Sequence, residues 1–449
     1  MVGSGSPWAQ YQSGKSTKCF PDSEQLFRKC AVFEDLFTAA VRAHNHQPRP
    51  LPSRECQSPE GRRCHLCFAE TLEYDLEVEI KNGALQEFWK SLQLPVPLEP
   101  LVRSPLGRGY RTVTKRKVYV QKGSVYLALI DPDETGRPEP FTVDRCAIEP
   151  AEHAEIYQRI QEAIEKPYAR PLAEHLSYVV IKGNYREFTL ILNVREISGG
   201  VVKASNTLSK SLTRLFPSIV GLFLYLDETG GKYYLGVKNP RVRSTAKKLF
   251  GKNTIFQRTC GRSFLYSPLS FSQVNQSLLE RLVSEADRLL ALTKESRLYD
   301  LYCGYGLFAL CLAEKAGSVV GVEISHDAVE SAIENAARHK AGRVRFLRSD
   351  IAADSIGTIL KQLRPHDRVI LDPPRGGTSE GVIEMIAGFG PEKVLHLFCN
   401  IDLMPVEIKR WLSSGFGIKH AVPVDMFPGT AAVETMALFE KQQPVVSSR

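Results

Sequence analysis

The sequence predicts an α/β protein with a doubly wound sheet in its C-terminal part, preceded by an α+β region. After Gln273, short runs rich in β-branched residues alternate with segments of helical periodicity. This alternation is typical of a parallel sheet covered on both faces. Upstream of Gln273, strand-like runs predominate and Gly- and Asn-rich turns separate them. We expect three parts: an extension over 1–54, the α+β central region over 55–274 and the doubly wound domain over 275–449.

The elements can be assigned in chain order from their periodicity. In the extension, Asp22 to Ala43 is predicted to form one helix. In the central region, strands are expected over 125–130, 178–181, 188–194 and 219–226. Apolar residues recur at helical spacing from Leu278 to Leu290 and predict an amphipathic helix. The strands of the last domain are expected over 297–302, 319–324, 344–347, 368–371, 394–398 and 434–440.

Composition excludes several classes of protein. The chain has 449 residues, of which 43% are hydrophobic and 24% charged, so it can bury more than one core. It has no run of the roughly 18 apolar residues that a membrane helix requires, and its first residues lack the apolar core of a secretory signal. The ten cysteines lack the dense spacing of a disulfide scaffold. We expect a soluble, cytoplasmic protein without membrane contact, and we infer no obligate protein partner.

The net charge of +8 is concentrated in two stretches that contain no acidic residue. Such stripes attract polyanions, because each neutralised phosphate releases condensed counterions. The two stretches therefore favour a nucleic acid as partner. Their cations are Arg103, Arg108, Arg111, Lys115, Arg116, Lys117 and Lys122 in the first, and Lys238, Arg241, Arg243, Lys247, Lys248, Lys252 and Arg258 in the second.

A glycine turn follows the first strand of the predicted sheet. Gly304 and Gly306 permit a tight turn and a close approach of the backbone to a cofactor. Glu323, at the end of the next strand, is placed to accept hydrogen bonds from ribose hydroxyls. Because the pattern Gly-x-Gly-x-x-Ala also fits a dinucleotide fingerprint, two cofactors remain open at this point: a nicotinamide or flavin dinucleotide, and S-adenosylmethionine.

Three further motifs at strand ends favour methyl transfer to carbon. They are Asp372-Pro-Pro-Arg375, Cys399-Asn400 and Glu434-Thr435. Uracil C5 is a weak nucleophile until a thiolate adds to C6, and a base must afterwards remove the C5 proton. Cys399, which precedes a predicted helix, is the candidate nucleophile, and Glu434 is the candidate base.

In combination these motifs resemble those of the RNA uracil-5 methyltransferase family, which makes 5-methyluridine in tRNA and rRNA. The resemblance covers about residues 56 to 440 and implies a Rossmann-like methyltransferase domain, a substrate base turned out of its stack, and Cys399 and Glu434 as catalytic residues. It further implies that S-adenosylmethionine is bound by residues Gln273, Tyr302, Gly304, Gly306, Glu323, Asp350 and Asp372. The chain departs from the family pattern at Leu307, Ile401 and Ala432.

Four cysteines form a second constellation. Cys64 and Cys67 are spaced to hold one metal centre, and Cys56 and Cys146 can complete a thiolate set. Some members of the family carry a [4Fe–4S] cluster on a cysteine triplet and one later cysteine, which this arrangement resembles. Zinc or free thiols are the alternatives.

Two functions from other classes remain open alongside methyl transfer. A dinucleotide-dependent oxidoreductase would use the glycine turn. A catalytically silent RNA-binding protein would keep the scaffold, and the departures at Leu307 and Ile401 leave room for it.

Overall fold

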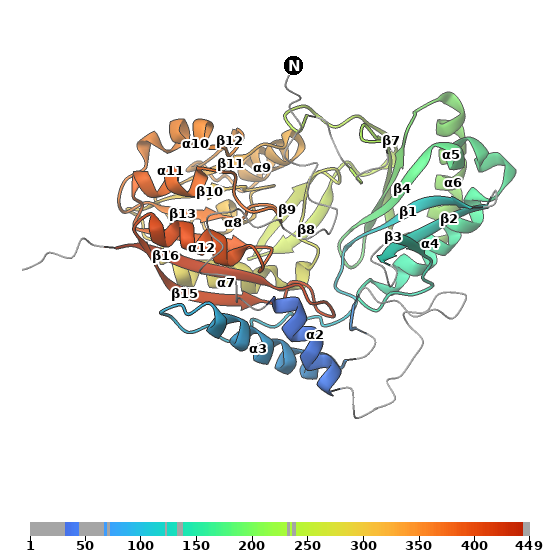
Figure 1. The fold of residues 1–449 in the computed structure, drawn as a ribbon. Coiled ribbons are helices and arrows are strands. Elements are labelled where there is room, and N and C mark those ends of the chain that lie inside the picture. Colours follow the sequence, from blue (N-terminus) through green and yellow to red (C-terminus); the bar gives the residue numbers. More distant parts are fainter. Residues whose placement is uncertain are drawn as a thin grey trace, which may run out of the picture.

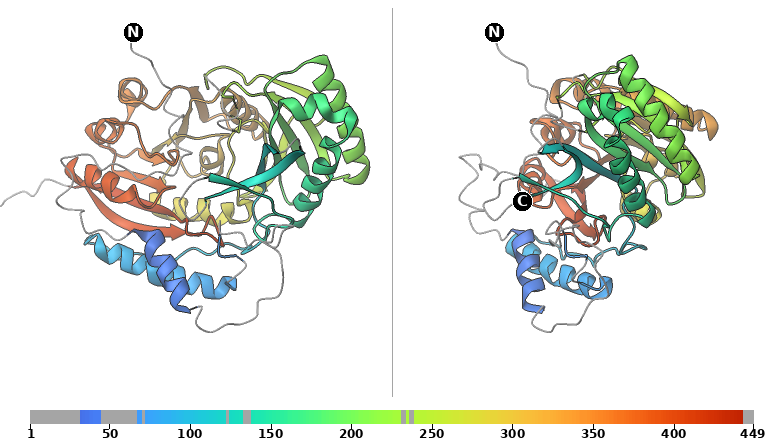
Figure 2. Two further views of the ribbon diagram at one scale, coloured as in Figure 1. Left: turned by 45° about the vertical axis from the view of Figure 1, so that its right-hand side comes forward. Right: turned by 90° about the vertical axis from the view of Figure 1, so that its right-hand side faces the viewer.

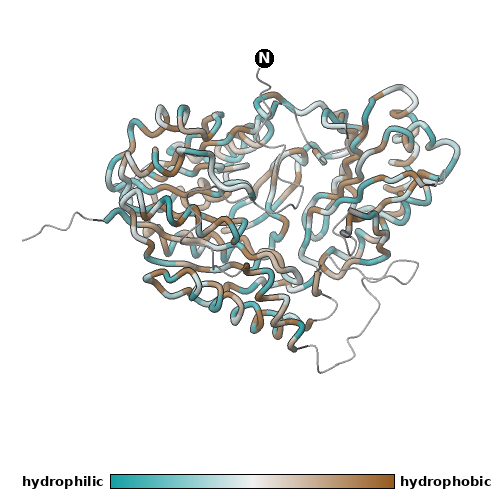
Figure 3. The backbone as a smooth tube through the Cα atoms, viewed as in Figure 1, coloured by the Kyte–Doolittle hydropathy of each residue, from teal (hydrophilic) through white to brown (hydrophobic). Residues whose placement is uncertain are grey.

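The computed structural model describes residues 32–44, 67–69, 72–121, 124–132, 138–230, 234–235 and 239–442. Figure 1 shows two lobes, one formed by the segment coloured yellow to red and the other by the segment coloured cyan to green. Hydrophobic residues follow the strands and the inner sides of the helices in both lobes (Figure 3). Each lobe therefore has its own sheet and its own core.

A seven-stranded sheet forms the centre of the C-terminal lobe. Its strands are β10 (Arg297–Leu301), β11 (Ser318–Glu323), β12 (Val344–Arg348), β13 (Arg368–Leu371), β14 (Lys393–Phe398), β15 (Phe416–Val424) and β16 (Glu434–Lys441). They lie in the order β12-β11-β10-β13-β14-β16-β15. Neighbouring strands from β12 to β14 are parallel, whereas β16 is antiparallel to both β14 and β15. The predicted doubly wound sheet is confirmed.

Helices cover both faces of this sheet. They are α7 (Leu279–Leu290), α8 (Leu307–Cys311), α9 (His326–Arg338), α10 (Ala353–Ile359), α11 (Val382–Phe389) and α12 (Met404–Ser413). Successive strand residues point to opposite faces, so Leu298 packs with α7 and α9, while Tyr299 packs with α11 and α12. The helix predicted from Leu278 to Leu290 is α7, and its apolar side is buried as expected.

A two-stranded hairpin joins the core of the C-terminal lobe. Its strands are β8 (Ile255–Thr259) and β9 (Arg262–Tyr266). Phe264 and Tyr266 are buried with α7, and the rings of Tyr266 and Tyr305 stack with centroids 4.6 Å apart. The hairpin precedes residue 275 in the chain but packs with the elements that follow it.

The second lobe contains the other seven-stranded sheet, in the order β3-β2-β1-β4-β5-β6-β7. Its strands are β1 (Val113–Gln121), β2 (Ser124–Pro132), β3 (Pro138–Phe141), β4 (Leu176–Gly183), β5 (Phe188–Val194), β6 (Ile219–Leu226) and β7 (Ala246–Gly251). All neighbours are antiparallel except β5 and β6. One face is covered by α4 (Ala151–Ile164), α5 (Arg170–His175) and α6 (Gly199–Leu215). The expected α+β character of this region is confirmed.

Two helices from the N-terminal part pack on the C-terminal lobe. They are α2 (Phe33–His44) and α3 (Tyr74–Ser91), and they lie beside the red strands in both views of Figure 2. Phe33, Phe37 and Phe88 are fully or almost fully buried in the same core as α11 and α12. The helix predicted from Asp22 to Ala43 agrees with α2 in its second half, and its first part lies outside the described residues.

A buried ionic network ties α3 to the loop after β15. Lys81 Nζ lies 2.8 Å from Glu77 Oε1 and 2.8 Å from Asp425 Oδ1. Tyr74 donates to Asp425 Oδ2 at 2.9 Å, and the Gly429 amide donates to Glu77 Oε1 at 2.5 Å. Buried charges must be paired to be tolerated, and here the pairing holds the loop that leads into β16.

The segment before β1 connects the two lobes. Val102 forms a bridge with Val424 of the C-terminal sheet, and Arg111 forms one with Asn275. The Thr112 amide donates to the Val274 carbonyl at 2.8 Å. Backbone pairing therefore fixes the start of β1 against the entrance to α7. Among the described residues, no helix is both long and apolar enough to cross a membrane.

Candidate active site

The glycine turn lies at the carboxyl end of β10. Tyr302, Gly304 and Gly306 all have positive φ, at 66°, 54° and 88°. A Cβ on Gly306 would lie 2.8 Å from the Phe346 ring, whereas a Cβ on Gly304 would meet nothing within 4 Å. Gly306 is therefore required by packing, and Gly304 borders free space that a ligand can approach.

Glu323, the last residue of β11, holds this turn. Its Oε2 accepts the Gly304 amide at 3.1 Å, and its Oε1 accepts the Ser325 amide at 2.8 Å. Burial raises the pKa of Glu323, and these amide donors oppose that effect. The carboxylate thus links the ends of two neighbouring strands, beside the expected ribose position.

Asp300 stabilises the glycine turn, and it is not among the site residues predicted from the sequence. Its Oδ2 accepts the Ala309 amide at 2.9 Å, and its Oδ1 has no hydrogen-bond partner among the described residues. Burial raises its pKa to about 8. Asp300 could have been identified from the sequence as an acidic residue near the end of the strand that precedes the glycine turn.

The other predicted cofactor residues gather at the same edge of the sheet. Gln273 Nε2 donates to Asp372 Oδ2 at 3.3 Å. Burial raises the pKa of Tyr302, and the nearby carboxylates of Glu407, Asp350 and Glu323 raise it further. The structure therefore brings the ends of β10, β11, β12 and β13 together with the segment before α7.

Strand register brings Cys399 beside Glu434. Phe398 of β14 pairs with Thr435 of the antiparallel β16, so the next residue of one strand faces the preceding residue of the other. The two side chains are close enough that each affects the pKa of the other. Cys399 Sγ also donates to Asp372 Oδ1 at 3.5 Å. A thiol and two carboxyl groups, far apart in the sequence, thus meet at one point.

Burial raises the pKa of all three side chains in this group. It raises the pKa of Cys399 well above the usual thiol value, and Glu434 and Asp372 add to the rise. It raises the pKa of Glu434 to about 8, with a further rise from Asp372 and an opposing effect of Arg375. Burial also raises the pKa of Asp372 to about 6, against the hydrogen bonds from Cys399 and Gln273. Glu434 Oε2 has no hydrogen-bond partner within the described parts of the chain.

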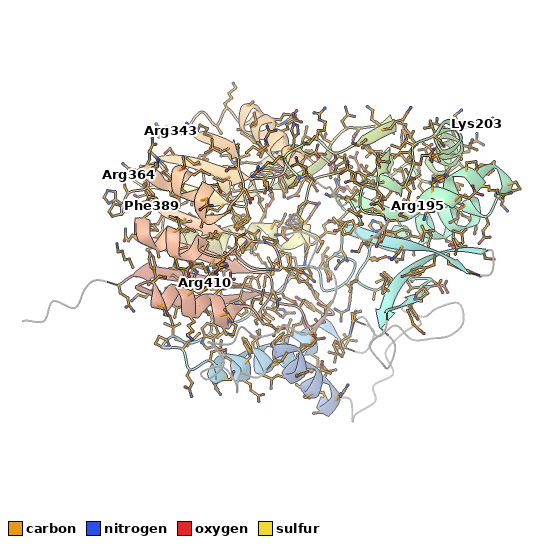
Figure 4. All side chains as sticks on the ribbon, turned by 45° about the horizontal axis from the view of Figure 1, so that its top comes forward. Arg195, Lys203, Arg343, Arg364, Phe389 and Arg410 are labelled. Atoms are coloured by element: carbon orange, nitrogen blue, oxygen red, sulfur yellow. The ribbon has the colours of Figure 1, made fainter. Side chains whose placement is uncertain are left out.

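Cations from both lobes border the site. Lys115 of β1 places its Nζ 3.9 Å from the centre of the Tyr234 ring. Burial lowers the pKa of Lys115 to about 8, and the charges of Arg111 and Arg375 lower it further. Arg375 lies over the Phe427 ring at 5.5 Å. Further basic side chains lie on both lobes, such as the labelled Lys203 and Arg343 in Figure 4.

The predicted cysteine set is only partly described. Cys56 and Cys64 lie outside the described residues. Cys67 and Cys146 pack against the same small apolar cluster of Ala69, Tyr110 and Ile148. No group of three or more His, Cys, Asp or Glu side chains that could hold a metal occurs within the described ranges.

The residues that depart from the family pattern occupy apolar surroundings. Leu307 and Ile401 are both buried, with 6% exposed surface each. Ala432 is partly buried against the core that contains α7. None of these replacements displaces the sulfur of Cys399 or the carboxyl group of Glu434 from the site.

The sheet order, the glycine turn and the loops at the carboxyl edge define a methyltransferase of the Rossmann-like class. The family model described as tRNA (uracil-5-)-methyltransferase matches residues 242–442. An uncharacterized RNA methyltransferase of Caldanaerobacter subterraneus is 30% identical over 407 residues, which cover 88% of this chain and 85% of that protein. The chain belongs to the RNA uracil-5 methyltransferase family, and it is a methyltransferase with S-adenosylmethionine as methyl donor and RNA as substrate.

Two further relatives have more specific names. The 23S rRNA (uracil(1939)-C(5))-methyltransferase RlmD of Pectobacterium atrosepticum is 34% identical over 191 residues, which cover 42% of each chain. The crystal structure of Pyrococcus abyssi tRNA (uracil-54, C5)-methyltransferase with S-adenosyl-L-homocysteine has a TM-score of 0.60 and 20% identity. It covers 84% of this chain and 87% of that chain. The second likeness shows the fold.

Proposed function

We propose that the protein methylates C5 of a uridine in a structured tRNA or rRNA through a covalent bond between Cys399 Sγ and C6 of the base. One observation carries this proposal: at the carboxyl edge of the sheet, Cys399 is hydrogen-bonded to Asp372 and lies beside Glu434 across the paired strands β14 and β16. Addition of sulfur to C6 places electron density on C5, which can then attack an electrophilic methyl group. Removal of the C5 proton afterwards restores the ring and releases the sulfur.

The thiol proton needs an acceptor when the bond to C6 forms. Asp372 Oδ1 lies 3.5 Å from Cys399 Sγ and already accepts the hydrogen bond that the thiol donates. Since the pKa of Cys399 is raised by burial and by both carboxyl groups, a free thiolate is unfavourable before the substrate is bound. We assign to Asp372 the role of accepting this proton as the C–S bond forms, and to Arg375 the role of favouring the negative sulfur.

Glu434 is assigned the second proton transfer. Its carboxyl group lies next to the sulfur, so it lies beside C5 when C6 is bonded to Cys399. A carboxyl group accepts a proton only in its ionised form. With a pKa near 8, Glu434 is ready to take the C5 proton in the more alkaline part of the physiological range.

The residues at the glycine turn fit S-adenosylmethionine. Gly304 borders free space, and carboxylates end the neighbouring strands, where ribose hydroxyls and an amino group can be bound. The residues that would hold this cofactor are Gln273, Tyr302, Gly304, Gly306, Glu323, Asp350 and Asp372. When bound, it supplies a methyl group on a sulfonium centre.

Charge around the site supports RNA as the substrate. Besides burial, the charges of Arg111 from one lobe and Arg375 from the other lower the pKa of Lys115, and they oppose the rise that burial causes in the pKa of Tyr234, which indicates a concentration of positive charge. Phosphate groups compensate such charge. A uridine in an RNA loop can be turned out of its stack at low cost, and its phosphates would then pass these cations. We further propose the cytoplasm as the compartment of the reaction.

Methyl transfer into RNA tests this function. The full chain is incubated with labelled S-adenosylmethionine and RNA from cells that lack the protein, and the RNA is digested to nucleosides. The expected label is in 5-methyluridine, and sequencing of the labelled RNA identifies tRNA or rRNA. Label in another nucleoside would overturn the proposal. RNA binding without any transfer would identify a silent binding protein, and thermal stabilisation by a dinucleotide but not by S-adenosylhomocysteine would identify an oxidoreductase.

We also propose that Cys56, Cys64, Cys67 and Cys146 hold a [4Fe–4S] cluster. The packing of Cys67 and Cys146 against one apolar cluster supports this, because those two residues come from distant parts of the chain. Cys146 directly precedes Ala147, whose carbonyl accepts the Gly109 amide at 2.9 Å. A cluster here would therefore stabilise the segment that leads into β1 and its cations.

Metal analysis after anaerobic purification tests the cluster. Iron and acid-labile sulfide are expected in equal amounts, with loss of both in Cys146→Ser. Cys260→Ser, at a cysteine in the other lobe, is the matched control and should retain them. Zinc without sulfide, or a folded protein free of metal, would show the cluster assignment to be wrong.

A further inference from the structure

Two cysteines outside the candidate active site, Cys260 and Cys311, line the same pocket. Cys260 lies in the turn between β8 and β9, with φ of 51°, and Cys311 is the last residue of α8. Their side chains are close enough that each affects the pKa of the other. Neither is in a disulfide in this structure, so both are available as thiols.

The pair lines a pocket that is open to the surface. The pocket has a volume of about 390 Å³ and is bordered by Cys260, Cys311, Glu280, Asp287 and Lys315, among others. Both cysteines are partly exposed. A small polar oxidant can therefore reach the sulfur atoms, in contrast to the buried sulfur of Cys303.

The surroundings make the two sulfur atoms chemically different. The interaction with the Cys311 thiol lowers the pKa of Cys260 to about 7, against the effect of burial, and Thr259 and Arg262 also contribute to the lowering. The same interaction raises the pKa of Cys311. Because the thiolate is the reactive form, Cys260 is the attacking sulfur and Cys311 is its neighbour.

We propose that Cys260 and Cys311 are a site of reversible oxidation, which converts the two thiols into a disulfide with hydrogen peroxide as the oxidant. Low-pKa, accessible cysteines next to a second cysteine are the kind that react in this way. Nothing in the methyl-transfer mechanism uses either residue, so the proposal stands independently of the proposed function.

The chemistry balances in two steps. The Cys260 thiolate attacks one peroxide oxygen, the S–O bond forms, the O–O bond breaks, and hydroxide leaves and is protonated to water. Cys311 sulfur then attacks the sulfur of the Cys260 sulfenic acid, so that the S–S bond forms and the S–O bond breaks. The departing hydroxide takes the Cys311 thiol proton and leaves as a second water. The two sulfurs are oxidised together by two electrons, which reduce the peroxide.

The disulfide would enclose the segment that carries much of the candidate cofactor site. Gln273, Tyr302 and Gly306 all lie between the two cysteines in the chain. Cys311 ends the short helix that begins directly after Gly306. Oxidation would thus cross-link the hairpin turn to the helix that follows the glycine turn.

Peptide mapping of the full chain tests this proposal. The reduced protein is treated with hydrogen peroxide, remaining thiols are alkylated, and the protein is digested without reductant. We expect a cross-linked peptide that contains Cys260 and Cys311, which disappears after dithiothreitol. Cys303 in the same sample should not react with peroxide and should be recovered as an alkylated thiol. Its side chain is buried, and burial raises its pKa well above the usual value.

Two variants separate the roles of the sulfur atoms. Cys260→Ser should lose the cross-link and leave Cys311 as an alkylated thiol. Cys311→Ser should lose the cross-link but gain dimedone labelling at Cys260, because the sulfenic acid has no partner. Thermal unfolding confirms that both variants are folded. Full alkylation of both cysteines in the peroxide-treated parent, or a cross-link of Cys260 to another cysteine, would overturn the proposal.

Discussion

Replacement of Cys399 by alanine is expected to abolish methyl transfer and to leave cofactor binding intact. The uracil ring cannot be activated at C5 without a nucleophile at C6, and Cys399 is the thiol that is hydrogen-bonded to Asp372 and lies beside Glu434. Loss of a covalent nucleophile in other enzymes lowers kcat by about 10⁴-fold or more. Initial rates with labelled S-adenosylmethionine measure the loss, and titration with S-adenosylhomocysteine measures binding.

The matched control for this variant is Cys260→Ser. Cys260 is also a partly exposed thiol in the C-terminal lobe, but it lines a different pocket. Its replacement should leave the rate of methyl transfer within about twofold of the parent, a difference of less than about 0.5 kcal/mol in activation free energy. Substantial turnover by Cys399→Ala would contradict the assignment of the nucleophile.

Replacement of Glu434 by glutamine should stop turnover after the methyl group has been transferred. Glutamine has nearly the same shape but cannot accept the C5 proton, so the bond between Cys399 and C6 cannot break by elimination. A methylated RNA–protein adduct should therefore accumulate. Denaturing gel electrophoresis measures it as labelled RNA that remains with the protein, and Glu440→Gln, on the same strand but partly exposed, is the control that should turn over normally.

The pH dependence of the parent follows from the same carboxyl group. Burial raises the pKa of Glu434 to about 8, so the group is mostly neutral below that pH and ionised above it. When proton removal limits the rate, kcat should rise about tenfold per pH unit below this value and level off above it. A rate that is independent of pH between 6 and about 9 would argue against Glu434 as the base.

Local patterns in the sequence predict the C-terminal sheet, except for its edge strand β15, and indicate that its site residues gather at one edge. Strand ends of a parallel sheet lie at one edge, so Glu323 and Asp372 are expected near each other, and in the structure, besides burial, the charge of Glu323 raises the pKa of Asp372. The contact between Cys399 and Glu434 also depends on β16 running antiparallel to β14. The motifs suggested this pair, but the strand register explains it.

Long-range packing set the features that the sequence did not reveal. The network of Lys81, Glu77 and Asp425 joins residues separated by most of the chain, and no periodicity signals such a contact. The hairpin of β8 and β9 also packs with α7, although it reads as part of the preceding strand-rich region. Tyr234, whose ring packs against the Lys115 ammonium group, lies in a Gly- and Lys-rich segment that has no helical or strand periodicity. The boundaries at 54 and 274 stay predictions.

The most direct test of the account uses RNA in which uridine is replaced by 5-fluorouridine. Fluorine at C5 cannot be removed as a proton, so the complex of sulfur, base and transferred methyl group should be trapped in the parent protein. Mass spectrometry of the digested complex should find a methylated fluorouridine on the peptide that contains Cys399. Attachment to a different residue, or methyl transfer with no covalent complex, would contradict the central claim that the sulfur of Cys399 activates the uracil ring for methylation at C5.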